Sequence, residues 1–171
     1  GVLGAARIAP QAIIKPAAAS DEASVVAVAA RDRAKAEAFA NKHDILNVHD
    51  SYAALIADPE IDAIYNPLPN GLHGEWTIAA LEAGKHVLCE KPFTSNAEEA
   101  RQVKAVADAH PDLVVMEAFH YRYHPFAERL RGIVQSGELG VVQRVETAMC
   151  FPLPRFGDIR YDYDLAGGAT M

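Results

Sequence analysis

Short runs of apolar residues alternate along the chain with longer segments in which apolar residues recur at helical spacing. The apolar runs have the length of β-strands and occupy residues 1–4, 25–30, 47–49, 63–66, 86–90 and 113–118. The segments with helical spacing occupy residues 8–15, 33–41, 52–57, 74–83 and 97–110. This alternation is typical of βαβ units, in which helices cover both faces of a parallel sheet. The pattern therefore predicts an α/β fold with a doubly wound parallel sheet.

The alternation of predicted strands and helices ends after residue 123, where His124 and Pro125 interrupt it. Residues 126–136 are predicted to form an amphipathic helix, and residues 141–150 alternate partly, as a strand with one exposed face does. Residues 151–164 are rich in proline and aromatic residues and are predicted to be a loop. We therefore divide the chain into a first domain over residues 1–123 and the beginning of a second over residues 124–171. Because neither end of the chain coincides with the end of a pattern, we expect a piece of a longer protein.

The composition is ordinary for a soluble globular protein, with 50% hydrophobic and 23% charged residues among 171. The net charge of -7, from 16 Lys and Arg against 23 Asp and Glu, argues against a nucleic-acid partner. No apolar run approaches the ~18 residues of a membrane span, and no signal-peptide pattern opens the chain. We expect a cytoplasmic protein without a membrane partner. Cys89 and Cys150 lie in no CxxC pattern, which argues against a disulfide scaffold or a cysteine zinc site.

A turn of small residues connects the first predicted strand to the first predicted helix. Gly4, Ala6 and Ala9 stand at the small-residue positions of a G-x-G-x-x-G/A turn, with Ala6 replacing the usual second glycine. Small side chains let the backbone approach a pyrophosphate at a helix N-terminus, where free N–H groups favour an anion. We predict that this turn binds a dinucleotide through Gly4, Ala6, Arg7, Ile8 and Ala9. An ordinary tight turn is the alternative.

The end of the second predicted strand indicates which dinucleotide is bound. A carboxylate there binds the ribose 2′-hydroxyl of NAD, whereas an arginine accommodates the 2′-phosphate of NADP. Ala30 stands where the carboxylate would be, and Arg31 follows it. We therefore predict NADP as the cofactor, in preference to NAD, and Arg31 as the residue that binds the 2′-phosphate. Asp32 leaves NAD open, because a small shift in register would bring its carboxylate to the ribose.

The fourth, fifth and sixth predicted strands run into characteristic segments: IYNPLPNGLH at residues 64–73, HVLCEKP at 86–92 and EAFHYRYHP at 117–125. With them the chain resembles the Gfo/Idh/MocA oxidoreductases over essentially its whole length. The motif of Glu90, Lys91 and Pro92 is the most telling. VAARD at residues 28–32 and EAF at 117–119 make the chain similar to the NADP-dependent dihydrodiol dehydrogenase and D-xylose 1-dehydrogenase branch. The resemblance implies a Rossmann domain followed by a substrate and dimerisation domain with an open, mainly antiparallel sheet.

The resemblance also assigns roles to individual residues. Lys91 is the expected catalytic residue, because its ammonium would lie beside the nicotinamide and the substrate oxygen whose charge changes during hydride transfer. Cofactor-binding positions of the family correspond to Leu68, Pro69, Asn70, His73, Glu90, Lys91 and Arg122. Substrate contacts are expected from Lys91, His120 and Arg160. His120 departs from the Trp or Met of relatives, and Arg160 is equally compatible with a surface loop.

The implied activity is that of an NADP-dependent dehydrogenase acting on CH–OH groups. Hydride would pass between the nicotinamide and a hydroxyl or carbonyl of a sugar or cyclic diol, and the full-length protein would form a homo-oligomer. The tyrosine proposed as acid/base in this branch would follow Met171. A non-catalytic NAD(P)-binding redox sensor or regulator is the alternative. No metal site is expected, because Glu117, His120 and His124 share a face only on a helix, and a strand is predicted there.

Overall fold

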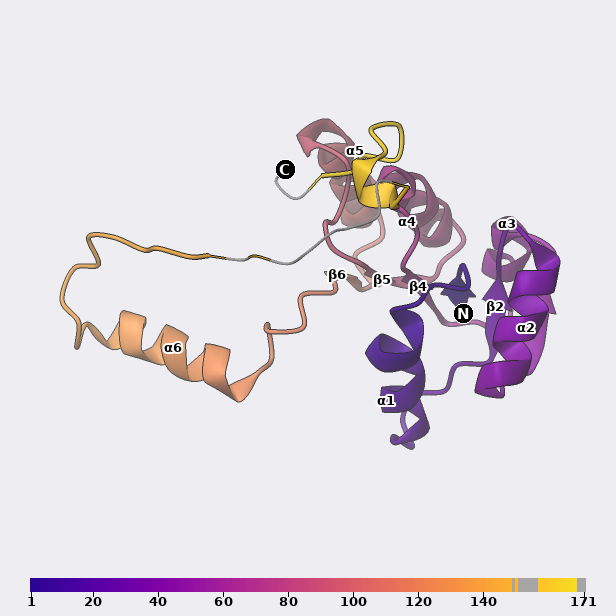
Figure 1. Ribbon diagram of the computed structural model, residues 1–171, viewed down its shortest axis with the longest axis horizontal. Coiled ribbons are helices and arrows are strands. Elements are labelled where there is room, and N and C mark those ends of the chain that lie inside the picture. The colour runs from indigo at the N-terminus through magenta and orange to yellow at the C-terminus, as the bar shows by residue number, and fades with distance from the viewer. Residues whose placement is uncertain (149, 151–156, 169–171) are drawn as a thin grey trace. The chain divides into compact units, whose positions relative to one another are not determined.

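The strands form one parallel sheet in a computed structural model that describes residues 1–148, 150 and 157–168 (Figure 1). They are β1 (Val2–Leu3), β2 (Ala27–Ala29), β3 (Asn47–His49), β4 (Ala63–Asn66), β5 (His86–Cys89) and β6 (Val115–Glu117). The 6-stranded sheet has the order β3-β2-β1-β4-β5-β6, and every neighbouring pair is parallel. The order reverses between β1 and β4, which is the position where doubly wound sheets bind nucleotides. The predicted doubly wound parallel sheet is confirmed.

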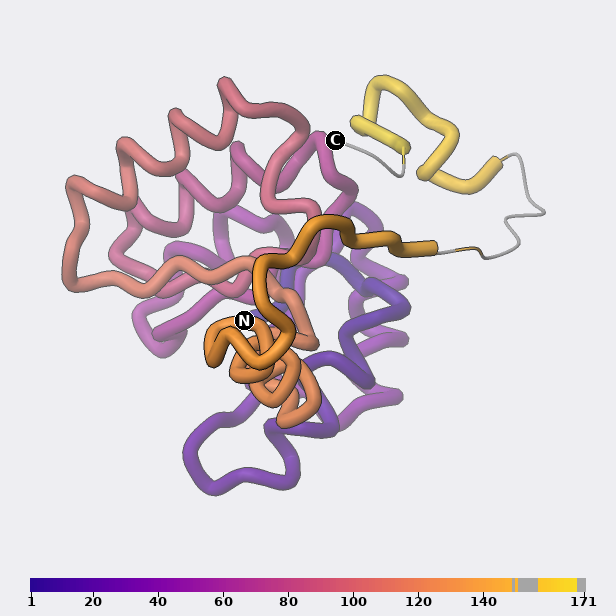
Figure 2. Tube along the Cα trace, turned by 90° about the vertical axis from the view of Figure 1, so that its left-hand side faces the viewer, coloured from indigo at the N-terminus to yellow at the C-terminus, as the bar shows by residue number. Residues whose placement is uncertain are grey.

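Helices follow the strands at nearly the predicted positions. The first is a continuous pair, η1 (Pro10–Ile14, a π-helix) and α1 (Lys15–Ala18). The others in this part of the chain are α2 (Arg33–His43), α3 (Tyr52–Ile56), the 3₁₀ turn η2 (Asn70–Leu72), α4 (His73–Glu82) and α5 (Ala97–Ala109). α4 and α5 pack side by side (Figure 2).

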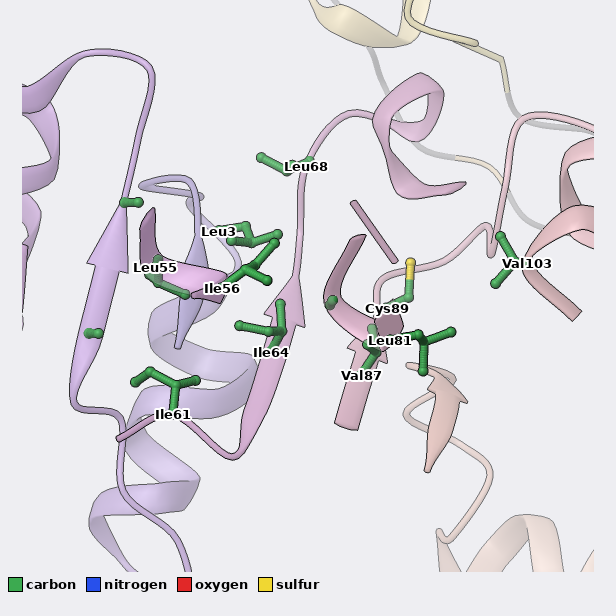
Figure 3. Close-up of a cluster of buried hydrophobic side chains, with 13 residues drawn as sticks. Leu3, Leu55, Ile56, Ile61, Ile64, Leu68, Leu81, Val87, Cys89 and Val103 are labelled. Atoms are coloured by element: carbon green, nitrogen blue, oxygen red, sulfur yellow. The ribbon is translucent and has the colours of Figure 1, made fainter. Parts of the chain in front are cut away.

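Each face of the sheet has its own hydrophobic cluster. On one face, strand residues such as Leu3 and Ile64 pack against Leu55 of α3, Leu81 of α4 and Val103 of α5 (Figure 3). On the other face, Val2, Val28 and Tyr65 pack with Ala9, the N-cap of η1, with Ile13 of η1 and with Ala40 of α2. Burying each large aliphatic side chain contributes about 1.5–3 kcal/mol. Burial on both faces thus explains the near-continuous apolar character of the inner strands β1, β2, β4 and β5.

Residues 1–118 and 159–171 form one compact unit, and residues 119–158 form another. The second unit contains α6 (Pro125–Ser136), as the amphipathic pattern predicts. The first unit also contains the 3₁₀ turn η3 (Ile159–Tyr161). The assignment of domains to residues 1–123 and 124–171 stays a prediction.

The strand predicted over residues 141–150 is not found, because residues 141–148 and 150 have no regular structure. A strand needs a neighbour for its main-chain hydrogen bonds, and the described residues of this unit contain no other strand. Residues 151–156 of the loop predicted over 151–164 lie outside the described residues, and the described part, residues 157–164, contains the short turn η3.

Candidate active site

The turn after β1 has an open anion-binding shape. Gly4 adopts a φ of +83°, and a Cβ at this position would lie 3.1 Å from Leu68 Cδ2. Its N–H donates to Ala29 O (2.6 Å), which ties the turn to β2. Ala9 is fully buried, whereas Arg7 and Ile8 are exposed. Within the described residues, the N–H groups of Ala6, Arg7 and Ile8 donate to no acceptor, so they are available to an anion.

The three charged residues after β2, Arg31, Asp32 and Arg33, differ in their partners. Asp32 is the N-cap of α2, where its carboxylate accepts the N–H of Lys35 (3.3 Å). Arg33 forms ion pairs with Glu37 and Asp50. Arg31 is exposed and has no ion-pair partner in the described part of the chain. Of these residues, Arg31 is therefore the one whose guanidinium is available to an anionic ligand.

Arg31 lines a cavity of about 440 Å³. Tyr52 and Trp76 meet edge to face on its wall, with ring centroids 5.1 Å apart. Burial raises the pKa of Tyr52, which keeps its phenol neutral. Leu165 completes the wall. The wall also contains Asp50, Ser51 and Glu75, but it is largely apolar and partly aromatic, which fits an adenosine whose phosphate lies at Arg31.

The loop after β4 is fixed by buried polar side chains. Asn66 is fully buried, and its amide donates to His73 O (3.2 Å) while its Oδ1 accepts the N–H of Leu68 (3.4 Å). The His73 ring is also buried, with Nε2 2.7 Å from Leu68 O and Nδ1 2.7 Å from Pro92 O. Both ring nitrogens thus face main-chain carbonyls. The structure gives His73 a role in joining two loops, and its contact with the cofactor stays a prediction.

Leu68, Pro69 and Asn70 lie between Asn66 and η2. Leu68 is buried beneath the Gly4 turn, and Pro69 and Asn70 are half-buried. The amide of Asn70 donates to Ala166 O (2.9 Å), and the N–H of Gly71 donates to Leu165 O (2.9 Å). The Asn70 side chain therefore holds the 162–167 segment in place.

The Glu90-Lys91-Pro92 turn continues β5, and its Lys91-Pro92 peptide is cis. Glu90 is buried: Oε1 accepts the hydroxyl of Tyr65 (2.8 Å), and Oε2 accepts the N–H of Lys91 (3.2 Å). The Lys91 side chain is exposed and forms no ion pair in the described residues. The turn is secured further where Glu117 Oε1 accepts the N–H of Phe93 (2.9 Å). A rigid turn thus presents a free ammonium group at the carboxyl ends of the strands.

Three further predicted site residues are His120, Arg122 and Arg160. His120 and Arg122 belong to the second unit, where Arg122 pairs with Glu128 (3.5 Å) and stacks over Tyr123 (5.2 Å). Arg160 is an exposed residue of η3. Their contacts with cofactor or substrate stay predictions.

Several residues of the site were not found by sequence reasoning: Tyr65, Asn66, Tyr52, Trp76 and, as a support of the turn, Glu117. The available signal was a pair of polar residues, Tyr65 and Asn66, in an otherwise apolar strand. A buried polar residue at such a position needs a hydrogen-bond partner.

Residues 1–148, 150 and 157–168 contain no group of three or more His, Cys, Asp and Glu side chains that could hold a metal ion. In the same residues, no helix is both long and apolar enough to cross a membrane.

Residues 1–118 match the model of the Gfo/Idh/MocA oxidoreductase family, which has an NAD-binding Rossmann fold. The chain belongs to this family. This member is 47% identical, over its whole length, to D-xylose 1-dehydrogenase (NADP(+)) 2 of Haloferax volcanii, of which it covers 52%. It is 43% identical over 119 residues to trans-1,2-dihydrobenzene-1,2-diol dehydrogenase of Bos taurus, a match that covers 70% of the chain and 35% of that protein.

A solved structure resembles this Gfo/Idh/MocA member closely. It is a mutant of a 3-ketoreductase from Actinomadura kijaniata in complex with TDP-benzene and NADP, with a TM-score of 0.88 and 36% identity. The match covers 98% of the chain and 51% of that structure. The chain thus spans about half the length of these relatives. The resemblance stated from the sequence motifs is confirmed.

Proposed function

We propose that the protein is an NADP-dependent oxidoreductase that transfers hydride between the nicotinamide and a hydroxyl or carbonyl of a sugar or cyclic diol. The observation that carries this proposal is Arg31, an unpaired guanidinium at the mouth of the cavity beside β2. Asp32 caps α2, which supports NADP over NAD because the competing carboxylate is engaged by the helix. The relatives named above as NADP-dependent or bound to NADP support the same cofactor.

The residues present fit this cofactor. A side chain at Gly4 would be strained, because its φ is +83° and a Cβ would lie 3.1 Å from Leu68 Cδ2, and the free N–H groups that follow suit a pyrophosphate. When bound, NADP supplies the hydride acceptor or donor at its nicotinamide ring. Glu90 retains acceptor capacity for ribose hydroxyls, since an ionised carboxylate has about four lone-pair sites and the chain uses two.

Lys91 would act on the substrate side. Its ammonium is free and extends from a turn held by Glu90, His73 and Glu117. In alcohol oxidation, the substrate hydroxyl loses a proton as the adjacent carbon loses hydride. A fixed cation beside that oxygen stabilises the negative charge that develops on it. In the reverse direction, the same ammonium polarises the carbonyl.

The alternative of a non-catalytic sensor finds no support in the relatives, whose names are those of dehydrogenases and reductases. Our expectations of a cytoplasmic location, of no nucleic-acid partner and of a homo-oligomer belong to the same proposal.

The experiment that tests the cofactor is a titration of NADPH and NADH into the wild type, Arg31→Ala and Arg33→Ala. We expect the wild type to prefer NADPH by roughly ten- to a hundredfold, because a charge-assisted hydrogen bond contributes about 1.5–3 kcal/mol. Arg31→Ala should lose this preference, and added salt should weaken it. Arg33→Ala is the matched control and should keep it, because Arg33 is already paired. Equal binding of both dinucleotides would shift the assignment to NAD or dual use, and binding of neither would overturn the oxidoreductase function.

A further inference from the structure

Tyr65 forms a buried hydrogen bond that links two neighbouring strands at the candidate site. It lies in β4 and is 4% exposed, and its hydroxyl donates to Oε1 of Glu90 at 2.8 Å. Glu90 directly follows β5 and is 8% exposed. Donors to ionised acceptors form shorter and stronger hydrogen bonds than neutral pairs. The phenol is therefore a substantial restraint on the direction of the carboxylate.

The Tyr65 ring itself has little freedom to move. It belongs to the hydrophobic cluster that contains Val2, Val28 and Ala9, with Ile13 packed against the cluster. Ala9 and Ile13 come from the turn and helix that follow β1, where the pyrophosphate is proposed to bind. The ring thus connects the phosphate side of the site to Glu90 through direct packing.

The phenol stays a donor across the physiological range. Burial first, and the hydrogen bond to Glu90 second, raise the pKa of Tyr65 well above its usual value. The other oxygen of Glu90 accepts the main-chain N–H of Lys91 (3.2 Å). Two fixed donors therefore orient the carboxylate plane, one from β4 and one from the turn that carries the Lys91 ammonium.

We propose that Tyr65 is a positioning residue of the reaction: it orients Glu90 so that the carboxylate binds the nicotinamide half of the cofactor. This inference rests on the proposed function. The phenol touches neither cofactor nor substrate and acts through Glu90. Removal of the hydroxyl alone should therefore weaken contacts with the nicotinamide half and leave the adenosine half, held at Arg31 and the cavity, unaffected.

The test compares two ligands on Tyr65→Phe in the full-length protein. NADPH carries both halves of the cofactor, and adenosine 2′,5′-bisphosphate carries only the adenosine half. We expect Tyr65→Phe to bind NADPH about tenfold more weakly and to bind adenosine 2′,5′-bisphosphate as the wild type does. Tyr163→Phe makes the same chemical change at a residue that is 91% exposed and should alter neither affinity.

A double-mutant cycle with Glu90→Gln or Glu90→Ala shows whether the effect passes through Glu90. Glu90→Gln keeps the shape of the side chain and one oxygen that can accept the Tyr65 hydroxyl, so the cycle remains measurable if Glu90→Ala does not fold. In the Glu90→Ala background, Tyr65→Phe should cause no further loss of NADPH affinity, and in the Glu90→Gln background the further loss should be smaller than in the wild type. Equal losses for both ligands, an additive cycle, or unchanged NADPH binding in Tyr65→Phe would each overturn the positioning role while the proposed function stands. A wild type that binds neither ligand would overturn both.

Discussion

His73 and Lys91 occupy opposite environments within one small region. The ring of His73 is 1% exposed and spans the carbonyls of Leu68 and Pro92, whereas the side chain of Lys91 is exposed and unpaired in the described residues. Burial of a polar ring between two carbonyls joins the loops after β4 and β5. By contrast, the main-chain N–H of Lys91 is held by Glu90, whereas its ammonium forms no ion pair in the described residues. The structural role therefore falls to His73 and the proposed chemical role to Lys91, which lie in two loops that the His73 ring joins.

We predict that Lys91→Ala in the full-length protein lowers kcat by roughly a hundredfold or more, since acid–base and electrostatic groups contribute about 10²–10⁴ in rate. The affinity for NADPH should change little, because Lys91 is expected to act on the substrate oxygen. Steady-state kinetics with the sugar or diol turned over fastest, together with NADPH titration, measures both. Lys104→Ala removes an exposed lysine paired with Asp108 in α5 and is the control. Unchanged turnover in Lys91→Ala would remove this residue from the mechanism.

At the scale of elements, caps and turns decide which side chains remain available to a ligand. Asp32 begins α2 as its N-cap, which favours Arg31 over Asp32 as the proposed contact of the cofactor ribose, a choice that sequence alone left open. In the same way, η2 begins where Asn70 and Gly71 bind the carbonyls of Ala166 and Leu165. Leu165 then forms a wall of the cavity beside Arg31. A short turn thus links the end of the described chain to the adenosine side of the site.

Gly71→Ala tests this link. An added Cβ would lie 3.1 Å from the carbonyl carbon of Leu165 and 3.3 Å from Asp164 O, both main-chain atoms that must move away. We expect this displacement to open the Leu165 wall and weaken adenosine 2′,5′-bisphosphate binding by roughly three- to tenfold, measured by calorimetry. Gly132→Ala is the control, because its Cβ would meet nothing within 4 Å and it lies in helix α6. Unaltered binding in Gly71→Ala would show that this wall does not contribute to the site.

At the scale of the whole molecule, the sequence pattern predicted those features that depend only on residues close together in the chain. The alternation of strands and helices predicted every strand of the sheet, and the turn at Gly4 and the motif at Glu90 marked its carboxyl edge. The bond from Tyr65 to Glu90 was not predictable, because it joins residues 25 positions apart that the fold brings together. The strand predicted over 141–150 is not found in residues 141–148 and 150, because a strand depends on a neighbour, which a local pattern does not specify.

The two cysteines should report separately on the two compact units. Cys89 is fully buried in the first, and burial raises the pKa of its thiol to about 12. Cys150 is exposed in the second. Because the thiolate is the reactive form, native Cys89 at pH 8 is ionised in only about one molecule in ten thousand. We expect a disulfide reagent to modify Cys150 at once and Cys89 only when the first unit opens.

Single substitutions identify the two phases of this reaction. Cys150→Ser should abolish the fast phase and keep the slow one, and Cys89→Ala should do the reverse. The slow phase should accelerate with urea well below the unfolding midpoint, because its rate then follows the free energy of opening of the sheet. Rapid modification of both thiols in the absence of urea would contradict the buried position of Cys89 between the sheet and α5. A slow phase insensitive to urea would show that the reagent reaches Cys89 without opening of this unit.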